Sequence, residues 1–312
     1  MYLDALARKS SGMMWMFNYI LRWFESLILR IVKTGQIPRH VALIMDGNRR
    51  YANTRNLAKG EGHSRGLDKL IEMVNLCTVL GITEVTVYAF SIENFQRTEE
   101  EVNEFMKLVK QKFRRLLDER EKLHEAGLCI RVIGNLSLLP KDLCKLIAET
   151  IVITKDNNNV ILNIALPYTS RDEVTSAIKD IGRGVKRAEI LPEDVDEDLV
   201  SDCLYFNRSP NPDLLIRTSG ETRLSDFLMW QIADTYIYFT DVMWPEFSIW
   251  NFLGAIFNYQ RCYPELQKNK KTKPIVRNNR VSTFLDKLQR ERDIAIYNMY
   301  VSDLPDQSAV QS

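Results

Sequence analysis

Three polar segments of this sequence contain the residue types that bind phosphate, and each follows an apolar run that predicts a strand. Arginine presents a planar fork of donors that matches phosphate oxygens, and a glycine lets the backbone approach an anion closely. A single carboxylate among such groups suits Mg²⁺, which takes one or two carboxylates and completes its shell with phosphate and water. The segments are DGNRRYA over 46–52, SIENFQR over 91–97 and RTSGETRLS over 217–225.

Taken singly, each of these residues has a simpler explanation. The tripeptide D-G-N at 46–48 is more typical of a turn than of a metal site. Asn94 could cap a helix, Arg97 could lie on the surface, and His63 could be an ordinary loop histidine. The residues by themselves therefore support a phosphate-binding α/β protein, because three segments converge and not because of one specific motif.

Between 37 and 262 the apolar pattern alternates between strand-like and helix-like segments. Strands separated by helices imply a mainly parallel sheet covered on both faces, so we expect a single α/β domain with a twisted sheet flanked by helices. In such sheets ligands bind beyond the carboxyl ends of the strands, where the three polar segments would meet. The expected strands are 41–45, 84–90, 129–133, 160–166, 214–216 and 236–239, and the expected helices are 67–77, 99–125, 140–155, 171–181, 227–233 and 252–259.

The composition is that of a globular protein. With 312 residues, of which 45% are hydrophobic and 27% charged, the chain is long enough for one large domain. A formal net charge of +1 gives no bulk electrostatic argument for a nucleic-acid partner. Five cysteines without a C-x-x-C pair and three histidines at unrelated spacings argue against a zinc site. We expect the cysteines to be reduced core residues of a protein that faces the cytosol.

The first 35 residues predict an amphipathic helix. The apolar run 13–32 carries a narrow polar stripe, and its three charges argue against a membrane-spanning helix. No small-x-small site follows it, which argues against a cleaved signal peptide. We expect the helix to lie in a membrane interface, with Trp15, Tyr19 and Trp23 at the headgroup level. The alternative is that the helix packs on the protein's own apolar surface or on a partner.

The C-terminal residues 263–312 form a basic tail. The segment 261–292 contains ten Lys or Arg against three Asp or Glu. Charge runs are usually solvated faces, so we expect a solvated helix or loop, with partner or membrane binding as the alternative. The expected organisation is therefore a helix over 1–35, a folded domain over 36–262 and a tail over 263–312.

From about Ile37 to Gln260 the chain resembles the cis-prenyltransferase family of undecaprenyl and dehydrodolichyl diphosphate synthases, and within it the eukaryotic dehydrodolichyl branch of catalytic subunits. The resemblance implies an apolar substrate tunnel between sheet and helices, with the helix 99–125 as one wall. It also implies that this helix is longer than in bacterial members, which in the family accompanies longer products. The matching blocks are HVALIMDGNRRYA, GHSRG, VTVYAFSIENFQR, IRVIGN, PDLLIRTSGETRLSDFLMWQ and YFTDVMWPEF.

The resemblance implies a transferase that adds isopentenyl diphosphate units in cis to farnesyl diphosphate, giving a long polyprenyl diphosphate for dolichol synthesis. Asp46 would hold Mg²⁺ and be required for catalysis, and Ser91 and Asn94 would lie beside the reaction centre. The base that removes the proton stays open between a diphosphate oxygen and the Asp46–Asn94 pair. The allylic diphosphate would lie among Gly47, Asn48, Arg49, Arg50, His63 and Arg97, and isopentenyl diphosphate among Arg217, Arg223 and Ser225.

The chain departs from the family pattern at three places. Lys59 stands where the family often has Arg, and Tyr236 stands where bacterial members often have a metal-binding Glu. No R-x-G motif follows Gln260. The resemblance therefore implies that a second, related subunit of the Nogo-B receptor type supplies this motif, in a complex peripheral to the cytosolic face of the endoplasmic reticulum membrane. The alternatives are a non-catalytic scaffold subunit of the same complex and a phosphate-binding hydrolase.

Overall fold

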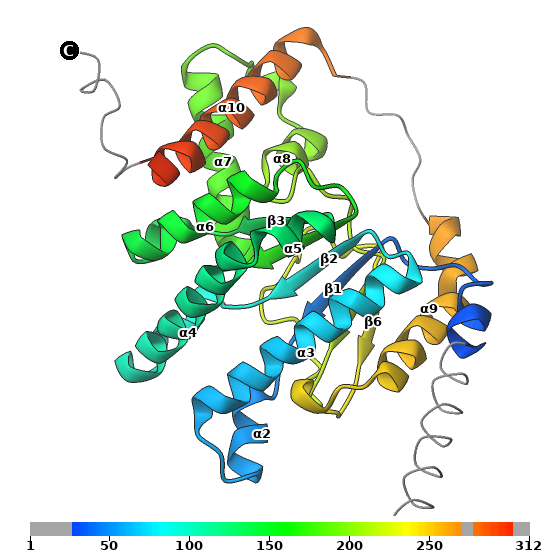
Figure 1. Cartoon of the computed structure of the whole chain (residues 1–312). Coiled ribbons are helices and arrows are strands. Elements are labelled where there is room, and N and C mark those ends of the chain that lie inside the picture. The colour runs from blue at the N-terminus through cyan, green and yellow to red at the C-terminus, as the bar shows by residue number, and fades with distance from the viewer. Residues whose placement is uncertain (1–26, 270–276, 302–312) are drawn as a thin grey trace, which may run out of the picture.

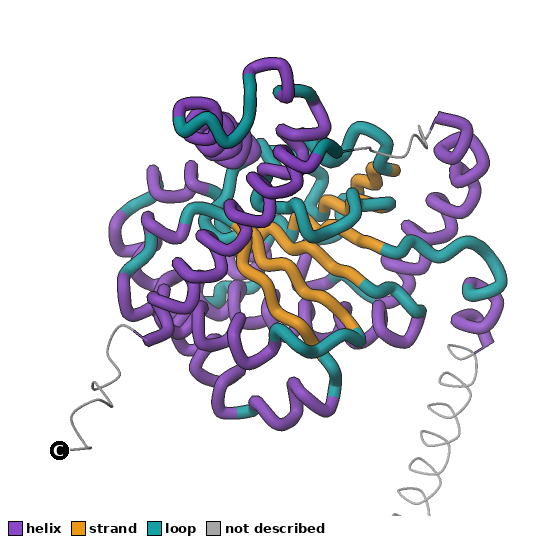
Figure 2. Tube along the Cα trace, turned by 90° about the horizontal axis from the view of Figure 1, so that it is seen from above, coloured by secondary structure: helices purple, strands orange, loops and turns teal. Residues whose placement is uncertain are grey.

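A six-stranded parallel sheet with helices against both faces forms the centre of the computed structural model, which describes residues 27–269 and 277–301 (Figures 1 and 2). Each neighbouring pair of strands is parallel, in the order β3-β4-β2-β1-β5-β6. This confirms the predicted single domain with a mainly parallel sheet. The strands are β1 His40–Ile44, β2 Glu84–Tyr88, β3 Leu128–Ile133, β4 Val160–Ala165, β5 Leu214–Arg217 and β6 Tyr236–Phe239.

Alternate residues of the central strands bury against different helices. Val41 and Leu43 of β1 belong to the core that α3 and α9 cover, whereas Ala42 and Ile44 face a second core that includes Phe206. Both sets are buried because a parallel sheet is covered on both faces. The helices are α2 Asn48–Thr54, α3 Lys59–Leu80, α4 Glu99–Asp118, α5 Arg120–Glu125, α6 Lys141–Thr154, α7 Ser170–Lys186, α8 Glu197–Cys203, α9 Ile249–Asn269 and α10 Asn279–Val301, with short 3-10 turns η1 Ile92–Gln96, η2 Leu136–Leu138, η3 Pro192–Asp194 and η4 Trp244–Glu246.

Two of the predicted helices differ in the structure. The segment 227–233 forms turns, so its prediction as a helix was wrong. Asp226 and Leu228 adopt positive φ angles of 59° and 49°, which an α-helix cannot accommodate. The predicted helix 99–125 is divided into α4 and α5 at Glu119, whose φ of −99° and ψ of 24° leave the helical region.

The segment predicted to be a solvated tail is only partly solvated. One face of α10 buries Val281, Phe284 and Leu288 in a cluster shared with α7 and α8. Arg292 donates to the carbonyl oxygen of Leu204 at 3.0 Å. The helix lies across α7 and α8 in Figure 1, at the end of the sheet away from α9. The charge count missed this face because the apolar residues of α10 are spaced among its charged ones.

The end of the predicted N-terminal helix packs on the domain. Residues 27–32 are helical, and Gln260 of α9 donates to the carbonyl oxygen of Val32 at 2.8 Å. Residues 1–26, which carry Trp15, Tyr19 and Trp23, lie outside the described residues. Over the ranges 27–269 and 277–301, none of the helices is both long enough and apolar enough to cross a membrane.

Candidate active site

A cavity of about 840 Å³ opens beyond the carboxyl ends of β1, β2 and β5. Its polar end receives side chains from the three strand-following segments, together with His63 from α3. The predicted site residues that line it are Asp46, Gly47, Asn48, Arg49, Arg50, His63, Ser91, Asn94, Arg97, Arg217, Arg223 and Ser225. The structure therefore brings every one of them to one place, while the ligand of each stays a prediction.

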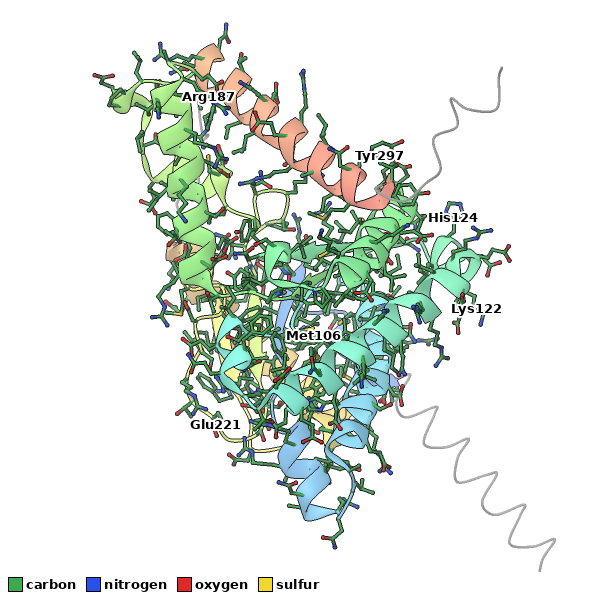
Figure 3. The ribbon with its side chains drawn as sticks, turned by 90° about the vertical axis from the view of Figure 1, so that its left-hand side faces the viewer. Met106, Lys122, His124, Arg187, Glu221 and Tyr297 are labelled. Carbon is green, nitrogen blue, oxygen red and sulfur yellow. The ribbon has the colours of Figure 1, made fainter. Side chains whose placement is uncertain are left out.

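The rest of the cavity is a predominantly apolar channel between the sheet and two helices. In Figure 3, α4 with Met106 labelled crosses the viewed face towards α5, which carries Lys122 and His124. The channel runs beneath α4 to the α4–α5 junction, where Leu123 lines it. This confirms the expected apolar cavity, with α4 as one wall. Its lining includes Leu67, Leu70 and Val74 of α3, Phe105, Val109 and Phe113 of α4, and Val87, Ile130 and Leu162 of the sheet.

Asp46 is held in place from several directions. Its Oδ2 accepts from Nη2 of Arg217 at 2.9 Å, and its Oδ1 accepts from the backbone N–H of Gly47 at 2.7 Å. The hydroxyl of Thr218 accepts from the backbone N–H of Asp46 at 3.0 Å and donates to its carbonyl oxygen at 2.9 Å. Strands β1 and β5 are neighbours in the sheet, so the strand order brings Arg217 and Thr218 next to Asp46.

Gly47 is required by its backbone geometry. It begins α2 with φ of 98°, a conformation that L side chains rarely adopt. A Cβ atom at this position would lie 2.4 Å from Oγ of Ser219, so the loop after β5 packs directly on the glycine. The turn that requires glycine at this position also directs Asp46 into the cavity.

Acidic partners neutralise most of the arginines. Arg217 is only 3% exposed and, besides its pair with Asp46, donates to Oγ of Ser225 at 2.8 Å. Glu101 of α4 pairs with Arg49 at 3.4 Å, and Glu221 pairs with both Arg50 and Arg223. Glu101 reaches Arg49 from α4, a helix that lies outside the three strand-following segments.

Arg97 is the arginine of the set without an ion-pair partner among the described residues. Burial lowers the pKa of Arg97, and the neighbouring positive charge of Arg49 lowers it further. A half-buried guanidinium without a direct ion pair among the described residues suits an incoming anion, which would supply a contacting counter-charge.

Asn94 and His63 reach the cavity in different ways. Asn94 Oδ1 accepts from the backbone N–H of Ser91 at 3.1 Å, so it caps η1, while Thr98 caps α4. The ring of His63 meets Phe105 edge to face, with centroids 5.7 Å apart. Both residues line the cavity, so the structural role of Asn94 does not remove it from the site.

Some residues of the site carried no signal that sequence reasoning used. Trp244 is 1% exposed, lines the cavity, and donates from Nε1 to the carbonyl oxygen of Gly66 at 2.7 Å. Tyr88 donates to the carbonyl oxygen of Ser225 at 3.1 Å. Both residues lie in blocks that carry the family resemblance, VTVYAFSIENFQR and YFTDVMWPEF, but neither was assigned to the site.

One departure from the family pattern, Tyr236, has a structural outcome. Tyr236 packs against the apolar core under α9, and burial raises the pKa of its hydroxyl. Its neighbours are therefore not those of a metal ligand. The side chain of Lys59 lies outside what the structure describes.

Asp46 fits the part of a Mg²⁺ ligand that shares its ion with a substrate. The carboxylate is 33% exposed, lines the cavity, and has arginines beside it that suit phosphate. Among the described residues, no group of three or more His, Cys, Asp or Glu side chains could hold a metal. A site with one protein carboxylate fits Mg²⁺, because this ion keeps several waters and binds substrate phosphates.

The comparisons with known proteins agree on one family. A family profile described as putative undecaprenyl diphosphate synthase matches residues 44–265. The chain is 49% identical to the human dehydrodolichyl diphosphate synthase complex subunit DHDDS over 256 residues, which are 82% of this chain and 77% of the relative. It is 46% identical to the tritrans,polycis-undecaprenyl-diphosphate synthase (geranylgeranyl-diphosphate specific) of Pyrococcus furiosus over 76% of this chain and 90% of that one.

A solved structure shares the fold. The crystal structure of lavandulyl diphosphate synthase from Lavandula x intermedia, in complex with dimethylallyl diphosphate, superposes with a TM-score of 0.68. The identity is 32%, and the match covers 72% of this chain and 95% of that one.

Proposed function

The chain belongs to the undecaprenyl diphosphate synthase family of prenyltransferases, and from that membership we propose that it is a catalytic subunit which adds isopentenyl diphosphate units in cis to farnesyl diphosphate. The product would be a long polyprenyl diphosphate for dolichol synthesis. One observation carries the proposal: Asp46 and a group of arginines occupy the polar end of a single cavity whose remaining wall is mainly apolar. A diphosphate with an isoprenoid tail is likewise charged at one end and apolar along the rest of its length.

Farnesyl diphosphate would place its diphosphate beside Asp46 and its tail in the channel under α4. Arg97 offers a guanidinium without a direct ion pair among the described residues, and Arg49 and Arg50 offer donors that now pair with acids. Mg²⁺, when bound to Asp46 and the diphosphate, would stabilise the negative charge of the leaving group. The arginines would stabilise the same charge from fixed positions, which is an efficient electrostatic contribution.

Isopentenyl diphosphate would lie against the loop after β5. Arg223 is 65% exposed and lines the cavity, so its donors are accessible to a phosphate. Arg217 is nearly buried and fixes Asp46 and Ser225 from behind. Holding the double bond of this substrate next to the allylic carbon would replace an encounter in solution by an aligned one.

Removal of the proton that ends each addition has two candidate acceptors. Both oxygens of Asp46 accept hydrogen bonds, and the side-chain oxygen of Asn94 caps η1. A diphosphate offers several terminal oxygens, so one can accept the proton while others are bound, and we favour it as the acceptor.

A partner subunit of the Nogo-B receptor type would complete the site with its R-x-G motif. The human relative is named as a subunit of a complex, and residues 261–312 of this chain contain no R-x-G sequence. Exposed apolar side chains lie on the edge strand β6 and on α9, which packs against it, and these suit a subunit interface. They are Phe239, Trp250 and Phe257. The complex would be peripheral to the cytosolic face of the endoplasmic reticulum membrane.

The test is incorporation of labelled isopentenyl diphosphate into polyprenyl diphosphate, with farnesyl diphosphate and Mg²⁺, using the full chain alone and with a co-expressed partner. Activity of the complex that disappears in Asp46→Ala is the expected result. An unchanged activity of that variant complex would establish a scaffold subunit instead. Release of diphosphate without isopentenyl diphosphate would point to a hydrolase.

A further inference from the structure

Glu221 links arginines that belong to the two different diphosphate sites proposed above. Its Oε1 lies 3.4 Å from Nη2 of Arg50, on α2, and its Oε2 pairs with Nη1 of Arg223, on the loop after β5. Both arginines line the cavity, whereas Glu221 does not. The carboxylate therefore holds both guanidinium groups from outside the cavity and shares one oxygen with each.

The fold determines where this carboxylate lies. Ser219 and Gly220 precede it with φ angles of 82° and 73°, and their N–H groups donate to the carbonyl oxygens of Val242 and Thr240, each at 2.9 Å. A non-glycine residue in the left-handed region is uncommon and persists where its surroundings impose it. Figure 3 labels Glu221 near the end of the molecule at which α2 lies.

We propose that Glu221 is a positioning residue that sets the spacing between the two bound diphosphates by fixing Arg50 and Arg223 relative to each other. The proposal rests on the function proposed above. Arg50 and Arg223 are 48% and 65% exposed, so packing alone does not fix their side chains. Each guanidinium has five donors in a rigid fork, so a contact with Glu221 still leaves donors for a phosphate.

The proposal predicts that loss of the Glu221 charge affects kcat more than the binding of either diphosphate. Without the negative charge of Glu221, each site keeps its own arginine, so either diphosphate alone should still bind. The two arginines would repel each other and sample more positions, which disturbs the alignment of both substrates. Misalignment by about 1 Å can lower a rate about 100-fold, so kcat is the sensitive quantity.

The experiment uses the full chain with its co-expressed partner and compares Glu221→Gln with wild type. We expect kcat to fall about 10-fold or more, while the Kd of isopentenyl diphosphate and that of inorganic pyrophosphate, each measured alone by calorimetry, change less than about 3-fold. Glu221→Asp keeps the charge on a shorter side chain and should have an intermediate kcat. It also serves as the test if the Gln variant does not fold.

The matched control is Glu246→Gln, which removes an ion pair of 2.7 Å with Arg55. Arg55 is the C-cap residue of α2, and its side chain does not line the cavity. The kcat of Glu246→Gln should equal that of wild type. A Glu221→Gln enzyme with wild-type kcat, or one whose loss lies entirely in binding, would overturn the proposal. Absence of any transfer by the wild-type complex would instead defeat the proposed function, so the two failures are distinguishable.

Discussion

Asp46 and Arg217 lie 171 residues apart in the sequence and form an ion pair with 2.9 Å between Oδ2 and Nη2. The guanidinium is 3% exposed and the carboxylate 33% exposed, so the acid faces the cavity and the arginine fixes it from behind. The pair joins the ends of two neighbouring strands, and with them the two proposed substrate sites.

The fork of Arg217 serves three acceptors at once: Asp46, Ser225 and the carbonyl oxygen of Arg223. A lysine offers a point charge that cannot reproduce this geometry. Arg217→Lys should therefore raise the KM for isopentenyl diphosphate about 10-fold and lower the free energy of unfolding by about 1–3 kcal/mol. Steady-state kinetics and urea unfolding measure both, with Arg55→Lys as the control. Wild-type values in both assays would show that the fork is not needed.

Gly47→Ala should destabilise the protein for two separate reasons. The positive φ is one, and the contact of 2.4 Å with Oγ of Ser219 is the other. We expect a loss of about 2–4 kcal/mol in the free energy of unfolding. Gly81 has φ of 85° with nothing within 4 Å of a built Cβ, so Gly81→Ala should show only the backbone cost, about 1–2 kcal/mol.

Ser219→Ala separates the two contributions at Gly47. It removes the hydroxyl that a new Cβ would meet, so it should recover part of the loss when combined with Gly47→Ala, and nothing when combined with Gly81→Ala. Urea unfolding of wild type, the three single variants and the two double variants gives the coupling. Strict additivity of Gly47→Ala and Ser219→Ala would contradict the close packing of the two residues.

Filling the channel should shorten the product. Val109 of α4 lines the cavity, so Val109→Phe would narrow the space beneath the helix and stop elongation earlier. Val102 lies two turns earlier on α4 but outside the cavity lining. Val102→Phe is therefore the control and should leave product length unchanged. Chromatography of the labelled polyprenols measures the distribution, and an unshifted distribution for Val109→Phe would rule out this path for the chain.

His40 should make the protein sensitive to acid. It is fully buried, Nδ1 donates to the carbonyl oxygen of Pro210, and Nε2 accepts from the hydroxyl of Thr86, each at 2.7 Å. Burial lowers the pKa of His40 below 6.5 because the charged form is desolvated. Folding thus favours the neutral ring, and its contribution is complete above the unfolded pKa.

This stability should be lost as the pH falls from about 6.5 towards the folded pKa, with a slope of up to about 1.4 kcal/mol per pH unit. His40→Gln removes the titration and should flatten the dependence. Urea unfolding between pH 7.5 and 5.5 measures the slope. Equal slopes for wild type and His40→Gln would show that His40 does not titrate in this range.

The sequence by itself determined the six strands, the parallel sheet and the residues of the three polar segments, because alternation and turn residues are local signals. It failed at 227–233, where Asp226 and Leu228 adopt left-handed conformations that packing imposes. It also overlooked the buried face of α10, because Val281, Phe284 and Leu288 become buried only by packing against α7 and α8.

Only the tertiary structure decided which charges meet. Sequence spacing cannot show that Glu221 lies between Arg50 and Arg223, or that Glu101 reaches Arg49. Electrostatic interactions depend on separation in space and on burial, and both are set by the strand order that places β1 beside β5. The sequence indicates which residues belong to the site, whereas the fold decides which of them form ion pairs.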